Sequence, residues 1–124
     1  QIPMREVFTA TPTSTSTEAY YSTLLHELAH WTGSQSRLAR LSMKNGFGSE
    51  GYAMEELVAE LASAFQCALL GISPSPREDH AKYLNNWLKV LKGDPKAIFK
   101  AAAAAEKAVR FIEDLQPQSQ EEAA

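Results

Sequence analysis

The chain has 124 residues, of which 44% are hydrophobic and 22% are charged, an ordinary balance for one globular domain. Twelve Lys and Arg against fifteen Asp and Glu give a net charge of -3, which disfavours a dedicated nucleic-acid binder. The single cysteine, Cys67, can form no internal disulfide, and no apolar run is long enough for a transmembrane helix. We therefore expect a cytoplasmic protein that does not bind membranes.

The N-terminal segment is predicted to contain one strand and one loop before the first helix. Residues 2–8 favour an edge strand, because Pro3 disfavours a helix there and edge strands tolerate proline. Residues 9–17 are mostly Thr, Ser, Ala and Pro and are predicted to form a solvated loop that ends at the N-cap Thr17. A helix follows from Glu18 to about Thr32. Its predicted packing residues recur at steps of three and four: Leu24, Leu25, Leu28 and Trp31.

A second helix is predicted after the glycine-rich, irregular stretch 33–51. It runs from about Tyr52 to Leu70, and Gly71 is suited to end it. Its predicted packing residues are Leu57, Leu61, Ala64, Phe65 and Ala68.

Two more helices complete the prediction. The third runs from about Arg77 to Lys92, and its inward residues are predicted to be Tyr83, Leu84, Trp87, Leu88 and Leu91. The fourth follows Asp94-Pro95, which suit an N-cap and a first helical position, and extends to about Leu115. The fold is thus predicted to be mainly α, with one domain over residues 1–115 and a flexible tail over 116–124.

The first predicted helix contains His26-Glu27-Leu28-Ala29-His30, an H-E-x-x-H motif. A spacing of four places both imidazoles on one helix face, where both can bind one metal ion. Neutral imidazole suits Zn²⁺, and a catalytic zinc takes three protein ligands and leaves one position open. The motif therefore predicts a zinc site whose third ligand comes from elsewhere in the chain.

Carboxylates on the second predicted helix are candidates for that ligand. Glu56 and Glu60 share a helix face, on a line that continues through Ser63 and Cys67 beside the apolar stripe. Acids at the margin of a core need a partner, which a metal or a histidine N–H provides. We assign Glu56 as the third ligand and Glu60 as an acceptor for the outer nitrogen of one histidine. Glu55 is the alternative ligand, because helical phase alone does not exclude it.

The motif also predicts hydrolysis. A metal ion lowers the pKa of a bound water to about 7. Glu27, about 100° round the helix from His26, is predicted to act as general base and to pass the proton to a leaving amine. The oxyanion needs a further stabilising group. The candidates are His80, Tyr83, Tyr52 or a residue of the 33–51 stretch.

Three stretches of the sequence carry a family resemblance: YYSTLLHELAHWTG at 20–33, SRLAR at 36–40 and FGSEGYAMEELVAE at 47–60. They closely resemble the C-terminal zincin-like metallopeptidase domain of the ArdC antirestriction proteins. The same domain type occurs in TraC-type plasmid primases and phage polyvalent proteins. The resemblance continues through residues 80–83 and the alanine-rich last helix to about Leu115.

The resemblance implies a zinc-dependent peptidase of the gluzincin kind. In it, His26, His30 and Glu56 bind the metal, Glu27 is the general base, and Glu60 is the acid that follows the ligand by four residues. It also implies a role in mobile elements, either countering host restriction or assisting DNA transfer, with a protein or peptide as substrate. DNA binding is expected only through a separate N-terminal domain absent here. The chain is expected to begin within the strand before the first helix, so that part of the family sheet is missing.

Two other functions compete with peptidase activity. The first is a binding module in which the metal is structural and the domain docks on a restriction or DNA-transfer protein. The second is nucleic-acid contact through a small basic cluster, which the acidic net charge disfavours. That cluster is predicted to lie in a solvated loop and consists of Arg37, Arg40 and Lys44.

Overall fold

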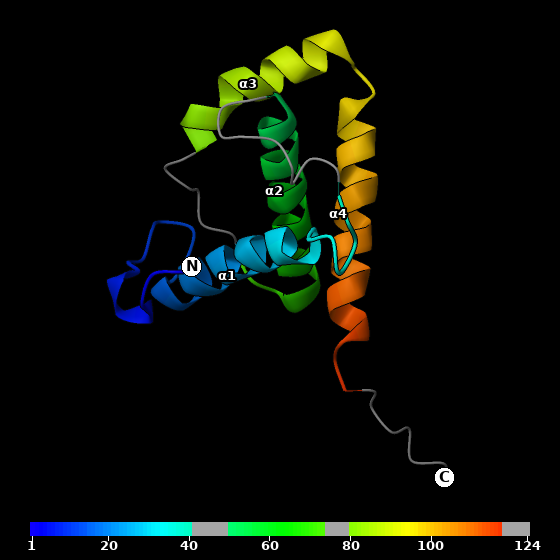
Figure 1. Ribbon diagram of the computed structural model, residues 1–124. Coiled ribbons are helices and arrows are strands. Elements are labelled where there is room, and N and C mark those ends of the chain that lie inside the picture. Colours follow the sequence, from blue (N-terminus) through cyan, green and yellow to red (C-terminus); the bar gives the residue numbers. More distant parts are fainter. Residues whose placement is uncertain (41–49, 74–79, 118–124) are drawn as a thin grey trace.

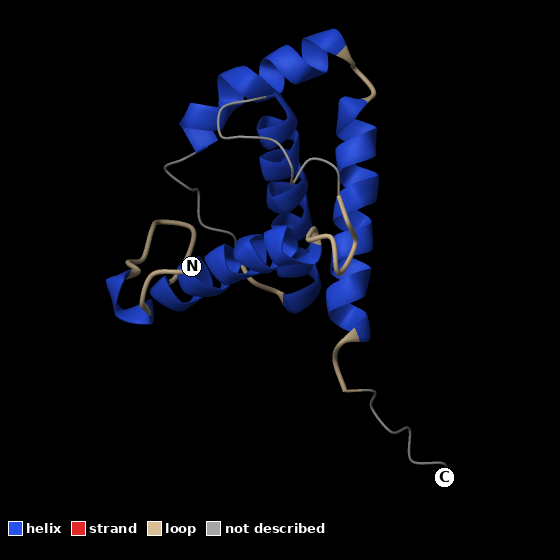
Figure 2. Ribbon diagram, viewed as in Figure 1, coloured by secondary structure: helices blue, strands red, loops and turns tan. Residues whose placement is uncertain are grey.

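The computed structural model describes residues 1–40, 50–73 and 80–117, except for the side chains of residues 50 and 80–83. Four α-helices dominate this part of the chain (Figure 1 and Figure 2). They are α1 (Ser16–Thr32), α2 (Glu50–Leu70), α3 (His80–Gly93) and α4 (Ala97–Asp114). Helix α2 is central: α1 crosses it, α4 runs alongside it, and α3 packs near its N-terminal end. The prediction of a mainly α fold with four helices is confirmed.

The predicted edge strand at residues 2–8 is wrong. Arg5–Val7 form a short 3-10 helix, η1, and the described part of the chain contains no strand. A strand needs a neighbouring strand for its hydrogen bonds, whereas η1 bonds locally, through Val7 N to Met4 O at 3.2 Å and Phe8 N to Arg5 O at 3.2 Å. The Arg5 guanidinium then lies 5.7 Å from the centre of the Tyr20 ring, which holds this segment against α1.

Helix α1 begins two residues earlier than predicted, because its N-cap is Thr15 and not Thr17. The Thr15 hydroxyl accepts a hydrogen bond from Glu18 N at 3.1 Å, and Glu18 Oε1 accepts one from Thr15 N at 3.2 Å. This reciprocal capping box satisfies two N–H groups of the first turn. The other carboxylate oxygen of Glu18 accepts from Ser73 N at 2.6 Å, so the start of α1 is also tied to the chain that leaves α2.

The core between α2 and α4 is built from small side chains. The fully buried alanines there are Ala59, Ala62, Ala101, Ala105 and Ala108. Several predicted packing residues lie outside the core instead: Trp31 is 43% exposed, Phe65 is 38% exposed, and Ala64 and Ala68 are exposed. Leu25 is buried as predicted, while Leu57 and Leu61 pack at the edge of the core. The buried faces of α1, α2 and α4 therefore carry mostly small and polar residues.

The helix ends mostly follow the sequence signals. Helix α2 ends at Leu70, and the following Gly71 has a φ of +69°, the left-handed conformation that glycine adopts without strain. The prediction that Asp94 caps the last helix is wrong: Lys96 is the N-cap of α4, and Asp94 Oδ1 accepts from Lys96 N at 3.0 Å. Residues 77–79, the predicted start of the third helix, lie outside the described residues.

Helix α3 contacts α2 through Trp87, among other residues. The Trp87 indole N–H donates to Ala53 O at 2.9 Å. Leu84 and Leu88, predicted to be inward, are 53% and 46% exposed. The prediction that these two leucines face the core is therefore wrong, whereas Trp87 does pack inward.

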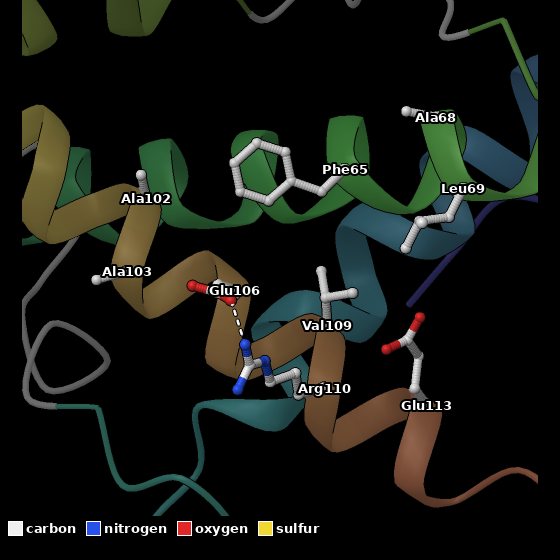
Figure 3. Close-up of a pocket in the computed structure, with 9 residues that line it drawn as sticks. All are labelled: Phe65, Ala68, Leu69, Ala102, Ala103, Glu106, Val109, Arg110 and Glu113. Atoms are coloured by element: carbon white, nitrogen blue, oxygen red, sulfur yellow. Dashed lines mark hydrogen bonds and ion pairs between the residues drawn. The ribbon is translucent and has the colours of Figure 1, made fainter.

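An apolar groove of about 800 Å³ runs between the C-terminal half of α2 and α4 (Figure 3). Phe65 and Leu69 of α2 face Val109 of α4 across it, and the ion pair between Arg110 and Glu106, at 2.6 Å, lies along one side. This groove contains neither of the two motif histidines. Among the described residues, no helix is both long enough and apolar enough to cross a membrane.

Candidate metal centre

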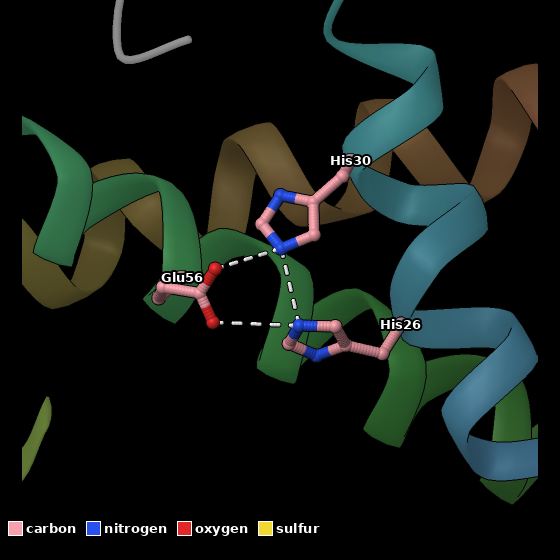
Figure 4. A group of neighbouring side chains, drawn as sticks. All are labelled: His26, His30 and Glu56. Atoms are coloured by element: carbon pink, nitrogen blue, oxygen red, sulfur yellow. Dashed lines mark hydrogen bonds and ion pairs between the residues drawn. The ribbon is translucent and has the colours of Figure 1, made fainter. Parts of the chain in front are cut away.

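Helix α1 presents both motif histidines toward α2, as Figure 4 shows. Their Nε2 atoms are 3.1 Å apart. His26 is only 2% exposed, and the side chain of His30 is 19% exposed. The i, i+4 spacing in a regular helix produces this pairing, as predicted from the motif.

Helix α2 adds the carboxylate of Glu56 to the same point (Figure 4). Glu56 Oε1 is 2.9 Å from His30 Nε2, and Glu56 Oε2 is 3.4 Å from His26 Nε2. One ligand atom from each of the three residues lies within 4.8 Å of the others. Zn–N bonds of roughly 2.0–2.1 Å at tetrahedral angles separate two nitrogens by about 3.3 Å. The 3.1 Å between the imidazole nitrogens is close to this value, so the donor set fits one metal ion.

The outer nitrogens of both imidazoles are also engaged by carboxylates. His26 Nδ1 is 2.9 Å from Glu60 Oε1, and His30 Nδ1 is 3.2 Å from Glu55 Oε1. The His30 Nδ1 contact with Glu55 is a hydrogen bond, the His26 Nδ1 contact with Glu60 is at ion-pair distance, and each Nε2 is directed at the other ligand atoms. This is the orientation in which histidines bind metals through Nε2. Glu60 thus lies where an outer-nitrogen acceptor was expected, beside His26.

Glu55 is placed differently from Glu56, although the two are neighbours in sequence. It is 3% exposed, and it accepts from Arg40 Nε at 3.0 Å and from Arg40 Nη2 at 2.5 Å. The prediction that Arg40 lies in a solvated loop is wrong, since its side chain is only 9% exposed. The sequence signal for this pair is indirect: a buried glutamate next to a ligand needs a cation, and arginine binds carboxylates in a bidentate manner.

The three donors and their neighbours shift one another's proton affinities. Burial works to lower the pKa of His30, but hydrogen bonds to Glu55 and Glu56 outweigh it and raise the pKa to about 9. Burial works to raise the pKa of Glu56, but hydrogen bonds from His26 and His30 lower it to about 2. Without a metal ion, the centre is therefore held together by a protonated histidine and an ionised glutamate.

We expect the metal-free protein to lose stability as the pH rises from about 6.5 to 9. The pKa of folded His30, about 9, lies above the unfolded value of 6.5, so protonated His30 stabilises the fold below pH 6.5 and this contribution disappears on passing pH 9. Glu56 contributes above pH 4.5, because its folded pKa is about 2. The measurement is the thermal midpoint of chelator-treated protein between pH 5 and 10.

The same titration with saturating Zn²⁺ is its control. Metal binding requires neutral imidazoles, so stabilisation by the metal increases over the window in which the metal-free protein weakens. A thermal midpoint of the metal-free protein that stays constant or increases from pH 6.5 to 9 would contradict the prediction.

The remaining predicted catalytic residues are less fully placed. Glu27 is half-buried on α1, directly after His26. His80 and Tyr83 are both near the start of α3, but their side chains lie outside the described residues. Tyr52 is half-buried on α2, one turn before Glu56 and on the same helix face. Of the candidates named individually for the oxyanion, it is the one whose side chain the structure describes.

An H-E-x-x-H helix facing a glutamate on a second helix is the donor arrangement of His₂Glu zinc peptidases. Comparison of the sequence with known families agrees with this geometry. The chain belongs to the family of zincin-like metallopeptidases (MPTase-PolyVal), whose model matches residues 1–104. The resemblance predicted from the sequence is confirmed.

Relatives of known sequence and structure support this membership. The chain is 53% identical over 97 residues to the DNA primase TraC of Escherichia coli, covering 78% of this chain and 9% of TraC. It is 44% identical over 102 residues to the uncharacterized protein y4eC of Sinorhizobium fredii, covering 82% of this chain and 33% of that protein.

Two crystal structures of the antirestriction protein ArdC from plasmid R388 are similar in fold. The Mn(II)-bound structure has a TM-score of 0.71 and 43% identity, over 79% of this chain and 36% of ArdC. The metal-free structure has a TM-score of 0.67 and 44% identity, over 78% of this chain and 34% of ArdC. This chain thus spans little more than a third of ArdC and less of the curated relatives.

Proposed function

We propose that this chain is the zinc-dependent peptidase domain of an ArdC-like antirestriction or DNA-transfer protein from a mobile element. The observation that carries the proposal is the convergence of His26, His30 and Glu56, with ligand atoms within 4.8 Å of one another, on an H-E-x-x-H helix and its neighbour. Family membership and the similarity to ArdC support it. The proposed substrate is a peptide bond of a protein in the cytoplasm of the recipient or host cell.

The choice of zinc follows from the donor set. ArdC has been crystallised with Mn(II). Divalent ions in a given nitrogen and oxygen site generally bind in an order that places Mn²⁺ below Zn²⁺. Two imidazoles and one carboxylate therefore favour zinc at equal concentrations. When bound, the ion supplies Lewis-acid polarisation of a carbonyl and of a water molecule.

The chain's own residues then have separate roles. Glu60 and Glu55 orient the imidazoles of His26 and His30 through their outer nitrogens. Glu27 takes a proton from the attacking water and transfers it to the amine that leaves. Stabilisation of the oxyanion is proposed for His80 or Tyr83 of α3, and Tyr52 is the alternative because it shares a helix face with Glu56.

The Glu27→Gln variant tests the proposal. It removes the proton acceptor and retains the size of the side chain, so we expect about one zinc per chain, as in the wild type, and cleavage reduced by about 10²–10⁴-fold. Zinc content is measured by elemental analysis, and cleavage with a quenched fluorescent peptide library. Glu106→Gln, an exposed change on α4, is the matched control.

Two outcomes would contradict the proposed roles. Wild-type protein without zinc would exclude the metal centre. Unchanged cleavage in metal-loaded Glu27→Gln would exclude Glu27 as the base.

The apolar groove between α2 and α4 favours a second candidate function, a binding module that docks on a restriction or DNA-transfer protein. In that case Glu27→Gln in the full-length protein would leave antirestriction in cells unchanged. Nucleic-acid contact by the basic cluster is less favoured, because the guanidinium of Arg40 is bound to Glu55. DNA binding by the full-length protein is proposed to reside in a separate N-terminal domain.

A further inference from the structure

We propose that Arg40 is a positioning residue of the metal centre: it holds Glu55 against His30 and thereby directs His30 Nε2 at the metal. The inference rests on the metal binding proposed above and extends it to a residue outside the H-E-x-x-H motif and the α2 glutamates.

Four hydrogen bonds place the Arg40 guanidinium between the two helices that carry the donors. On α1, Nη1 donates to Thr32 Oγ1 at 2.8 Å and Nη2 donates to Ala29 O at 2.7 Å. On α2, Nε and Nη2 donate to the two oxygens of Glu55 at 3.0 and 2.5 Å. The guanidinium therefore links the last turn of α1, which contains His30, to the residue that precedes Glu56.

The loop that carries Arg40 is folded back toward this position. Three backbone N–H groups of this loop donate to carbonyls at the end of α1 and just after it. Leu38 N donates to Thr32 O at 2.9 Å, Ala39 N to Ser34 O at 2.9 Å, and Arg40 N to Gly33 O at 3.0 Å. Ala39 has a φ of +50°, a left-handed conformation that is unfavourable for an alanine because its Cβ crowds the backbone. A strained residue directly before Arg40 indicates that the surrounding contacts determine where the guanidinium lies.

The pairing also separates the roles of the two adjacent glutamates. Glu55 Oε1 accepts from both Arg40 Nη2 and His30 Nδ1, and Glu55 Oε2 accepts from Arg40 Nε. Both oxygens are therefore engaged on the outer side of His30, while Glu56 faces the two Nε2 atoms. A buried carboxylate without the arginine would be an uncompensated charge beside the metal.

The experiment compares Arg40→Lys with Arg37→Lys in metal-loaded and metal-free protein. Lysine keeps the charge but lacks the planar guanidinium, which donates to both Glu55 oxygens and to α1 at the same time. Arg37 is the matched control: it lies in the same loop, with its guanidinium 3.9 Å from the centre of the Trp31 ring. With chelator competition we expect the zinc affinity of Arg40→Lys to fall by about 10–100-fold, and that of Arg37→Lys to stay within about twofold.

A second measurement separates positioning from general stability. In zinc-loaded protein, the Nδ1–H protons of both ligand histidines are observed by NMR. Arg40→Lys should shift the His30 proton and speed its exchange with solvent, and should leave the His26 proton, which faces Glu60, unchanged. If Arg40→Lys does not fold, Thr32→Val replaces it, because it removes a single acceptor of Arg40 and keeps every charge. The expected loss of affinity is then about tenfold.

The outcomes distinguish this inference from the proposed function. Wild-type protein that binds no zinc would overturn both. Zinc binding in the wild type, with unchanged affinity and an unchanged His30 proton in the folded variant, would overturn the role of Arg40 alone. Equal changes at His26 and His30 would also overturn it, since they indicate a general loosening of the fold.

Discussion

Replacement of Glu56 by glutamine is expected to weaken zinc binding by more than about 100-fold, beyond the 10–100-fold range typical of outer partners. The substitution removes a carboxylate that lies within 4.8 Å of an imidazole nitrogen of both histidines. A neutral amide is a weaker metal ligand and leaves the two histidines as the remaining strong donors. The measurement is competition with a chelator of known zinc affinity, on protein shown by circular dichroism to be folded.

The comparison with Glu55→Gln determines which of the two neighbouring glutamates is the ligand. Glu55 contacts His30 at the outer nitrogen, at 3.2 Å, and it also accepts hydrogen bonds from Arg40. We therefore expect Glu55→Gln to weaken binding less than Glu56→Gln, by about 10–100-fold. If Glu55→Gln releases the ion and Glu56→Gln retains it, the assignment of Glu56 as ligand is wrong by one residue.

Replacement of Ala105 by leucine is expected to destabilise the fold by about 2–3 kcal/mol, the upper part of the range for overpacked cores. Ala105 is 0% exposed and belongs to the alanine cluster where α4 packs on α2. Three additional carbon atoms at this position have to push the helices apart, because neighbouring residues such as Ala59 and Ala62 are also fully buried. Urea unfolding of the zinc-loaded protein gives the free energy of unfolding.

The control is the same substitution two residues earlier. Ala103 is exposed on α4 at the apolar groove (Figure 3), so Ala103→Leu should change the free energy of unfolding by less than about 0.5 kcal/mol. Equal destabilisation by both variants would show that helix propensity, and not close packing, determines the effect.

Local spacing made the centre of the site predictable from the sequence. The i, i+4 rule brings His26 and His30 together without any knowledge of the fold. The line from Glu56 through Glu60 to Cys67 was expected at the margin of the core. Glu56 and Cys67 prove to be buried, 7% and 1% exposed, and Glu60 is half-buried. A line of polar residues on an otherwise apolar helix is thus the stronger indicator of the buried face of α2.

The predicted packing residues were less successful because large apolar residues occur on more than one face of each helix. In α2, Phe65 and Leu69 lie at the groove surface, and Ala59 and Ala62 lie in the core. Alanine contributes little to a hydrophobic pattern, yet its small side chain permits α4 to pack closely against α2. Such patterns do not reveal partners that are distant in the sequence, which is why the sequence alone predicts a solvated loop for Arg40.

The donors of the centre come from two helices that are far apart in the sequence, so a bound ion would cross-link α1 to α2. Such a link favours the folded chain over the unfolded ensemble by its full binding energy. A newly synthesised chain that meets no zinc would then spend more time open and be degraded sooner by cellular proteases. We therefore expect the abundance of the protein in cells, and not only the proposed peptidase activity, to depend on the supply of the metal.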